Sequence, residues 1–178
     1  MRKLLNSELN RKTTEEVQKS EKVPIIIVLD NVRSQNNVGS VFRTADAFLI
    51  EAIYLCGITG QPPSREITKT ALGATESVRW KYFTDTAEAI KELRGFNYSI
   101  VAIEQAEGSV ELQNFFIEKE KKYAVIFGHE VNGVAQEVLD ICDHCIEIPQ
   151  FGMKHSFNIA VSAGIVLWEL DRKIKANH

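Results

Sequence analysis

Short apolar runs alternate with polar, turn-rich stretches along most of the chain. Residues 24–30 read Pro-Ile-Ile-Ile-Val-Leu-Asp, a continuous β-branched run typical of a strand buried on both faces of a parallel sheet. Similar runs predict further strands at 52–56, 78–83, 98–103, 123–127 and 143–148. We therefore expect a sheet built from strands that are well separated in the sequence.

Helical spacing fills the intervals between these runs. Apolar residues at positions 38, 41, 42, 45 and 48 share one helical face, and Asp85 caps an expected helix that ends near Leu93. Shorter helices are expected at 66–72, 112–120 and 134–139. This alternation predicts a single α/β domain whose mostly parallel sheet is flanked by helices.

The last apolar stretch runs from Phe157 to about Lys173 and is apolar nearly all round as far as Trp168. This pattern predicts a helix buried between layers. Two interpretations fit the residues before it. Ser156 is either an ordinary helix N-cap, or part of a ligand-binding loop beyond the carboxyl end of a strand.

The length of 178 residues fits one domain, with 44% hydrophobic and 25% charged residues as in ordinary globular proteins. We expect a short helix or arm at 1–22 and the folded domain at 23–178. No apolar run approaches the ~20 residues of a membrane span, and the N-terminus turns polar too early for a secretory signal. The expected location is the cytoplasm.

The net charge of −3 argues against a uniformly basic coat but leaves room for a local basic patch. Arg65, Lys69, Arg79 and Lys81 are candidates for it. Cys142 and Cys145 form a lone C-x-x-C, and only His144 lies close enough to add a ligand, so we expect no metal site.

Three polar loops follow three of the expected strands, at 31–43, 128–134 and 149–158. Because the carboxyl ends of parallel strands share one edge of a sheet, we expect these loops to meet there. A ligand site at this edge is the prediction.

The first loop contains Asn37, Gly39 and Arg43 in an N-x-G-x-x-x-R pattern. Helical side chains lean toward the N-terminus, so glycine at 39 would give the guanidinium of Arg43 room to reach the helix start, a place suited to phosphate. The alternative is a surface arginine paired with a nearby acid such as Asp46.

The second loop has Gly128 and Gly133, which permit close backbone approach or unusual dihedral angles, and Glu130 near a helix N-terminus. The chain has neither G-x-G-x-x-G after its first strand nor a P-loop, so no common nucleotide fold is indicated. His129 and His155 are either bases or exposed loop residues.

Taken together, the motifs resemble a known family. Asn37-Val38-Gly39 with Arg43-Thr44-Ala45, then residues 128–134, then Ile148-Pro149-Gln150-Phe151-Gly152 with 156–160, resemble in order and spacing the three motifs of the SpoU (TrmH-like) RNA ribose 2'-O-methyltransferases of the SPOUT superfamily. The resemblance covers about 23–170. Phe157 stands where the family more often has leucine or methionine.

The resemblance implies a C-terminal trefoil knot, a homodimer with active sites near the interface, and S-adenosyl-L-methionine bound in the knot. Carried over by position, the residues implied to hold the cofactor are Ile103, Glu104, Gly128, Ile148, Met153, Ser156 and Phe157. The implied catalytic set is Asn37, Arg43, Glu130, Ser156 and Asn158.

The implied reaction is methyl transfer to a ribose 2'-hydroxyl of RNA, with tRNA favoured over rRNA. Such a displacement needs alignment and removal of one proton but no metal. Arg43 is the family's proposed base, yet a guanidinium is ordinarily never deprotonated, so a phosphate clamp is the second interpretation. The competing functions are a catalytically silent RNA- or cofactor-binding module and, on fold analogy alone, a small-molecule enzyme.

Overall fold

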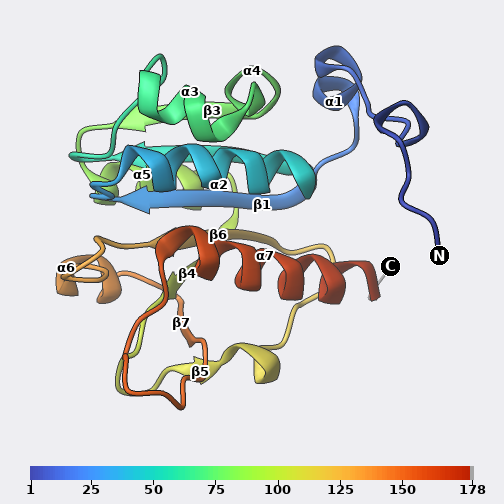
Figure 1. Cartoon of the computed structure of the whole chain (residues 1–178). Coiled ribbons are helices and arrows are strands. Elements are labelled where there is room, and N and C mark those ends of the chain that lie inside the picture. Colours follow the sequence, from blue (N-terminus) through green and yellow to red (C-terminus); the bar gives the residue numbers. More distant parts are fainter. Residues whose placement is uncertain (177–178) are drawn as a thin grey trace.

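The computed structural model describes residues 1–176 and contains one seven-stranded sheet in the order β3-β2-β1-β6-β4-β7-β5 (Figure 1). Every described strand pair is parallel. The strands are β1 (Val23–Asp30), β2 (Ile50–Cys56), β3 (Arg79–Phe83), β4 (Tyr98–Ile103), β5 (Val110–Glu111), β6 (Lys122–Phe127) and β7 (His144–Glu147). The predicted α/β fold with a parallel sheet is confirmed.

Helices lie on both faces of this sheet (Figure 1). They are α1 (Thr14–Lys19), α2 (Gln35–Ala47), α3 (Arg65–Ala71), α4 (Ala74–Ser77), α5 (Thr86–Gly95), α6 (Gln136–Leu139) and α7 (Ile159–Ala176), with 3₁₀ turns η1 (Asn6–Glu8) and η2 (Leu112–Asn114). Helices α2, α3 and α7 pack on one face, and α5 and α6 pack on the other. The short helix α4 was not predicted.

The central strand β1 is buried on both faces, as its sequence predicts. Ile27 and Leu29 face the core formed with α2 and α7, and Val28 faces the core formed with α5. All three side chains are fully buried. Burying one such side chain contributes about 1.5–3 kcal/mol, so β1 is a main source of stability.

Helix α7 is amphipathic rather than buried all round, so the prediction of a helix between layers is wrong. Ala163, Leu167 and Leu170 are fully buried against the sheet, whereas Val161 and Trp168 are 50% and 61% exposed. The sheet covers one side of α7, and no described element covers the other.

The segment 112–120, predicted to be helical, forms only the short turn η2 and then an extended chain. Phe115 and Ile117 are both buried, a two-residue alternation that suits extended backbone better than a helix. Lys173 Nζ donates to the carbonyls of Leu112, Gln113 and Phe115 at 2.8–3.0 Å. One lysine of α7 thus binds carbonyls that a continuing helix would have used.

Strand β7 lies between β4 and β5, two strands that precede it in the chain. Residues 104–109, which connect β4 to β5, therefore pass from one side of β7 to the other. This strand order is compatible with the trefoil knot that the resemblance implies, and the knot itself stays a prediction.

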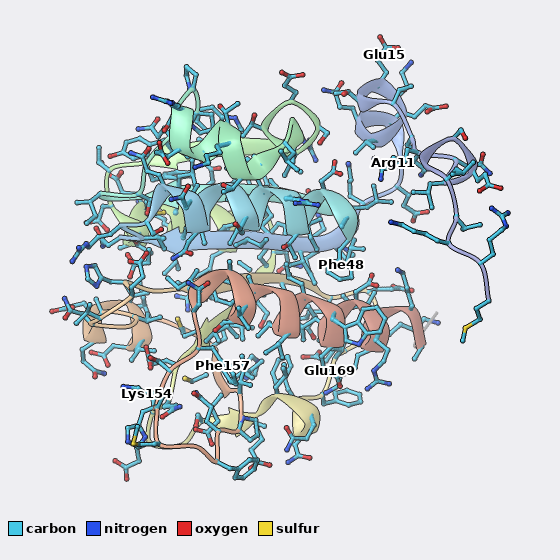
Figure 2. The ribbon with its side chains drawn as sticks, in the orientation of Figure 1. Arg11, Glu15, Phe48, Lys154, Phe157 and Glu169 are labelled. Atoms are coloured by element: carbon cyan, nitrogen blue, oxygen red, sulfur yellow. The ribbon has the colours of Figure 1, made fainter. Side chains whose placement is uncertain are left out.

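The N-terminal arm carries one stable turn of helix. Thr13 and Glu16 form a reciprocal capping box at the start of α1, and Val17 is the buried residue of that helix. Gln18 Nε2 donates to the carbonyl of Glu76 at 2.8 Å. In Figure 2, Arg11 and Glu15 of this arm lie at the opposite end of the molecule from Lys154.

The division into an arm at 1–22 and a domain at 23–178 stays a prediction, and residues 177–178 of that range lie outside the described residues. Among residues 1–176, no helix is both long enough and apolar enough to cross a membrane. The cytoplasmic location likewise stays a prediction.

Candidate active site

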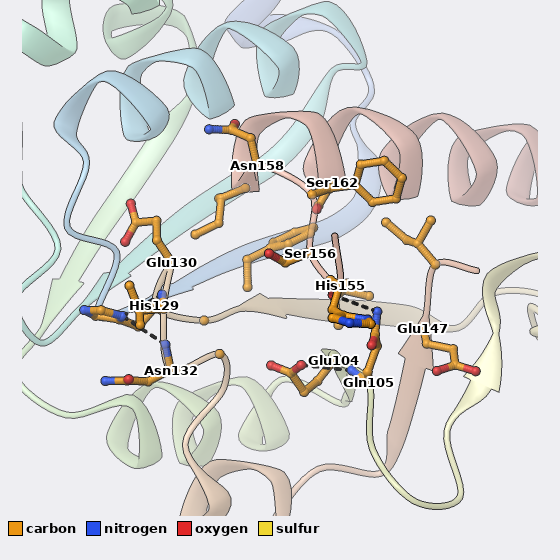
Figure 3. Close-up of a pocket in the computed structure, with 18 of the residues that line it drawn as sticks. Glu104, Gln105, His129, Glu130, Asn132, Glu147, His155, Ser156, Asn158 and Ser162 are labelled. Atoms are coloured by element: carbon orange, nitrogen blue, oxygen red, sulfur yellow. Dashed lines mark hydrogen bonds between the residues drawn. The ribbon is translucent and has the colours of Figure 1, made fainter. Parts of the chain in front are cut away.

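The three polar loops meet at the carboxyl edge of the sheet, around an open cavity of about 540 Å³ (Figure 3). The loops after β6 and β7 supply most of the lining, and Ile103, Glu104 and Gln105 supply more from the end of β4. The loop after β1 joins the site through hydrogen bonds to the other two loops. The predicted ligand site is therefore present at the predicted edge.

The carboxylate of Glu130 binds the start of α2. It accepts hydrogen bonds from the backbone N–H groups of Arg33 and Ser34 at 2.9 and 2.8 Å, and from Asn37 Nδ2 at 3.2 Å. Ser34 is itself the N-cap of α2. A carboxylate is favourable here because the first N–H groups of a helix have no partner within it.

These contacts decide the charge state of Glu130. Partial burial raises the pKa of its carboxyl group, but the hydrogen bonds from Arg33, Ser34 and Asn37 outweigh burial and leave the pKa below its ordinary value. Glu130 is therefore ionised at neutral pH, and it is a weak base.

Asn158 connects Glu130 and Asn37 to the third loop. Asn158 Nδ2 donates to Asn37 Oδ1 at 3.1 Å, and Asn158 Oδ1 accepts from the backbone N–H of Ala160 at 2.9 Å. Asn158 is therefore the N-cap of α7, and the interpretation of Ser156 as N-cap is wrong. The chain of contacts Glu130–Asn37–Asn158 joins all three loops.

Close backbone approach shapes the wall of the cavity, as predicted for the two glycines of the second loop. A Cβ on Gly128 would lie 2.2 Å from the carbonyl carbon of Gly133. Gly133 has a φ of +67°, and a Cβ there would lie 2.0 Å from Glu104 Oε2. Neither position has room for a side chain.

The cavity contains most of the residues that the resemblance implies. Those that line it are Ile103, Glu104, Gly128, Ile148, Ser156 and Phe157 from the cofactor set, and Glu130, Ser156 and Asn158 from the catalytic set. Met153 is not part of the lining and is 84% exposed.

A family model described as the SpoU rRNA Methylase family matches residues 24–168. The chain belongs to this family.

Relatives of known name support the same assignment. This SpoU-family chain is 29% identical over 167 residues to the tRNA (guanosine(18)-2'-O)-methyltransferase of Thermus thermophilus, covering 94% of this chain and 84% of the relative. It is 29% identical to the 23S rRNA (guanosine-2'-O-)-methyltransferase RlmB of Neisseria meningitidis, covering 84% of this chain but only 59% of that protein.

Solved structures of relatives show the same fold. The AdoMet-bound rRNA methyltransferase from Sinorhizobium meliloti is 31% identical with a TM-score of 0.78, and the match covers 85% of this chain and 57% of that one. The A. aeolicus TrmH/SpoU tRNA modifying enzyme is 26% identical with a TM-score of 0.79, and the match covers 92% and 81%.

Within the SpoU-family chain, Arg43 lies apart from the cavity. Its side chain is exposed, it is not part of the lining, and no described residue accepts a hydrogen bond or ion pair from it. The alternative pairing with Asp46 is wrong, because Asp46 instead accepts a hydrogen bond from Ser77 Oγ at 2.5 Å.

Gly39 has a different role from the one predicted. A Cβ there would lie 2.1 Å from Thr70 Oγ1 and 2.3 Å from the carbonyl oxygen of Ile67. Gly39 therefore allows α3 to pack closely on α2, and the idea that it makes room for Arg43 is wrong.

Sequence reasoning on this SpoU-family chain missed the side chain of Gln105 and the contacts of Glu104, which together close the cavity. The carboxylate of Glu104, a residue of the implied cofactor set, accepts from the N–H groups of Gln105 and Val134, both at 2.9 Å. Gln105 Nε2 donates to the carbonyl of His155 at 3.0 Å. Their position directly after a predicted strand was the only signal available.

The C-x-x-C pair makes local contacts. Cys142 Sγ donates to the carbonyl of Val138 at 3.1 Å, and Cys145 Sγ donates to that of Glu104 at 3.4 Å. Burial raises the pKa of Cys142 to about 12. Within residues 1–176, no three His, Cys, Asp or Glu side chains gather as metal ligands would.

The cap formed by Glu130 makes a pH-dependent contribution to stability. Because its pKa is lowered in the folded protein, this contribution is present above the ordinary value of 4.5 and is lost as the pH falls through the folded pKa. Glu130→Gln is expected to lower the free energy of unfolding at pH 7 by about 1.5–3 kcal/mol, the range for hydrogen bonds to a charged group.

Urea unfolding of both proteins between pH 3 and 7 measures this difference, which should shrink toward acid. Glu137→Gln is the control, because Glu137 is exposed and no described residue pairs with it. A difference that is independent of pH would show that the charge of Glu130 is not what stabilises the cap.

Proposed function

We propose that this chain transfers the methyl group of S-adenosyl-L-methionine to a ribose 2'-hydroxyl of RNA. The observation that carries the proposal is the contact chain Glu130–Asn37–Asn158, which joins the three motif loops of a SpoU-family chain around one cavity. The names of the Thermus and Neisseria relatives give the reaction, and the AdoMet-bound Sinorhizobium structure gives the cofactor.

The cavity has the features that such a cofactor requires. Its volume of about 540 Å³ falls in the range of small-molecule sites, roughly 300–1,000 Å³. Ile103, Ile148 and Phe157 offer apolar walls, and Gly128 and Gly133 bring backbone groups close. We propose that these residues and Ser156 hold the cofactor, which when bound supplies the electrophilic methyl group.

The protein's own contribution is alignment and charge. Methyl transfer is an in-line displacement, so holding the attacking oxygen at the right angle lowers the barrier by removing orientational freedom. We assign this positioning to Asn37 and Asn158, whose side chains are fixed by each other and by Glu130. Glu130 is an anchor in this scheme, because its lowered pKa makes it a poor acceptor of the hydroxyl proton.

The exposed guanidinium of Arg43 has no described partner, so it is available to a phosphate of the RNA. A clamp on that phosphate would also stabilise charge developing on the attacking oxygen. This role avoids the difficulty that an arginine with a pKa above about 12 does not act as a base.

We favour tRNA over rRNA as the substrate. The match to the Thermus tRNA enzyme takes in 94% of this chain and the match to the Neisseria rRNA enzyme 84%, so more of this chain has a counterpart in the tRNA enzyme. The alternative of a catalytically silent RNA- or cofactor-binding module predicts binding without transfer, which separates it from an enzyme.

The first test is transfer of a tritiated methyl group from S-adenosyl-L-methionine to separate tRNA and rRNA pools, with and without a chelator. We expect labelling of RNA, stronger for tRNA, that a chelator does not reduce, because neither alignment nor the phosphate clamp requires a metal. Cofactor binding without transfer to any RNA would favour the silent module, and loss of activity with the chelator would contradict the metal-free mechanism.

We propose that the uncovered face of α7 binds a second copy of the chain. An apolar groove there is lined by residues that include Ile148, Pro149, Gly164 and Trp168. Ile148 also lines the cofactor cavity, so a partner seated in the groove would lie beside the active site, as the resemblance implies. The partner would remove the large exposed area of Trp168 from water.

The expected mass in light scattering at micromolar concentration is therefore twice the 20.1 kDa of one chain. Trp168→Glu should shift the protein toward the monomer, because it places a charge in the apolar interface. Phe96→Glu is the matched control, since Phe96 is 60% exposed at the end of α5 on the other face of the sheet. A wild-type monomer that methylates RNA would rule out the dimer.

Substitutions of Arg43 distinguish a phosphate clamp from an arginine that has only a structural role. Arg43→Ala should leave cofactor affinity nearly unchanged and reduce methyl transfer by ~100-fold or more, the usual loss for one transition-state donor. Arg43→Lys should also fail largely, because an ammonium group lacks the bidentate fork. Calorimetry and single-turnover transfer measure the two effects, and near-normal turnover of Arg43→Lys would exclude the fork.

A further inference from the structure

The side chain of His129 is fixed in one orientation by the loop after β6. Its ring nitrogen Nδ1 accepts from the backbone N–H groups of Val131 at 3.0 Å and Asn132 at 3.3 Å. An imidazole nitrogen that accepts carries no proton, so the proton of the neutral ring lies on Nε2. The contacts thus determine the tautomer.

The backbone around His129 restricts its imidazole ring to this position. His129 and Gly133 exchange two hydrogen bonds, N–H to O=C, at 2.9 and 2.8 Å. Gly128 lies too close to the backbone of Gly133 to carry a Cβ, and Gly133 has a φ of +67°. The turn is therefore compact, and the imidazole is held inside it by Nδ1.

The Nε2–H group has no such partner. No described residue accepts a hydrogen bond from it, although the ring is half-buried and lines the cavity. Figure 3 shows the ring beside Glu130, with its second nitrogen directed away from the turn. A donor held rigidly at the rim of a site is prepared for an acceptor on a ligand, since ordering the ring costs nothing further on binding.

The position of His129 indicates which ligand that is. Gly128 and Gly133 of the same loop belong to the cofactor wall. The His129 ring lies instead beside Glu130, whose carboxylate binds the N–H groups of Arg33 and Ser34. Arg33, whose N–H group binds Glu130 next to this ring, is an exposed cation. A neighbouring cation favours the anionic RNA backbone as the molecule that approaches here.

We propose that His129 Nε2–H donates a hydrogen bond to a backbone oxygen of the RNA next to the target ribose. This role rests on the proposed methyltransferase function and adds an RNA-binding residue to it. His129 acts as a neutral donor, and the same ring holds the turn that positions Glu130.

Two substitutions separate the two ring nitrogens. In His129→Asn, the side-chain oxygen falls near the position of Nδ1 and can accept from Val131 and Asn132, but nothing replaces Nε2. In His129→Gln, the amide nitrogen falls near Nε2, but the acceptor that holds the turn is lost. The first variant keeps the turn and removes the RNA contact.

The experiment compares calorimetric cofactor affinity with steady-state methyl transfer to the best RNA pool for both variants and the wild type. We expect His129→Asn to bind cofactor within twofold of the wild type and to raise the KM for RNA by about tenfold, the size of one hydrogen bond. We expect His129→Gln to weaken cofactor binding as well, because Gly128 and Gly133 lie in the cofactor wall.

The calorimetric stoichiometry gives the fraction of each variant that is folded and binds cofactor. Each methyl-transfer rate is divided by this fraction, so partial unfolding does not affect the comparison. An unchanged KM for His129→Asn would overturn the RNA contact, and so would equal losses in cofactor affinity and transfer. If the wild type itself transfers no methyl group, the proposed function fails. That outcome differs from the two results for His129→Asn, which require an active wild type.

Discussion

The carboxylate of Glu130 at the N-terminus of α2 is the contact on which the rest of the site depends. It joins a loop that follows β6 to a helix that follows β1, nearly a hundred residues earlier in the chain. Asn37 extends the connection to Asn158, and Asn158 caps the N-terminus of α7. One ionised side chain thus sets the relative positions of three loops and two helix starts.

The parallel sheet makes this arrangement possible. All described strand pairs are parallel, so the loops that follow β1, β4, β6 and β7 emerge at one edge. The backbone there is brought closer than side chains allow, and Gly128 and Gly133 are the residues that permit it. Polar side chains that follow buried strands are then held by one another, which orders the site before a ligand enters.

The acceptors of the site are largely occupied, whereas two donors of the motif residues are not. Glu130 and Glu104 each accept from backbone N–H groups that the fold provides. Arg43 and the Nε2–H group of His129 have no described acceptor. A site of this kind suits an anionic ligand, even in a chain whose net charge is −3, because the local surface rather than the total charge meets the ligand.

The sequence by itself determined six of the seven strands, their parallel pairing and the edge where the loops meet, whereas the two-residue strand β5 was not predicted. A β-branched run such as residues 24–30 is typical of a sheet covered on both faces, and this constraint is local. The tertiary structure decided what each polar residue contacts. Gly39 faces α3, Asn158 donates to Asn37, and Glu104 accepts from the N–H group of Val134, because these contacts join segments far apart in the chain. The same reason explains the segment 112–120, because the contact of its carbonyls with Lys173 of α7 is one that the local pattern does not reveal.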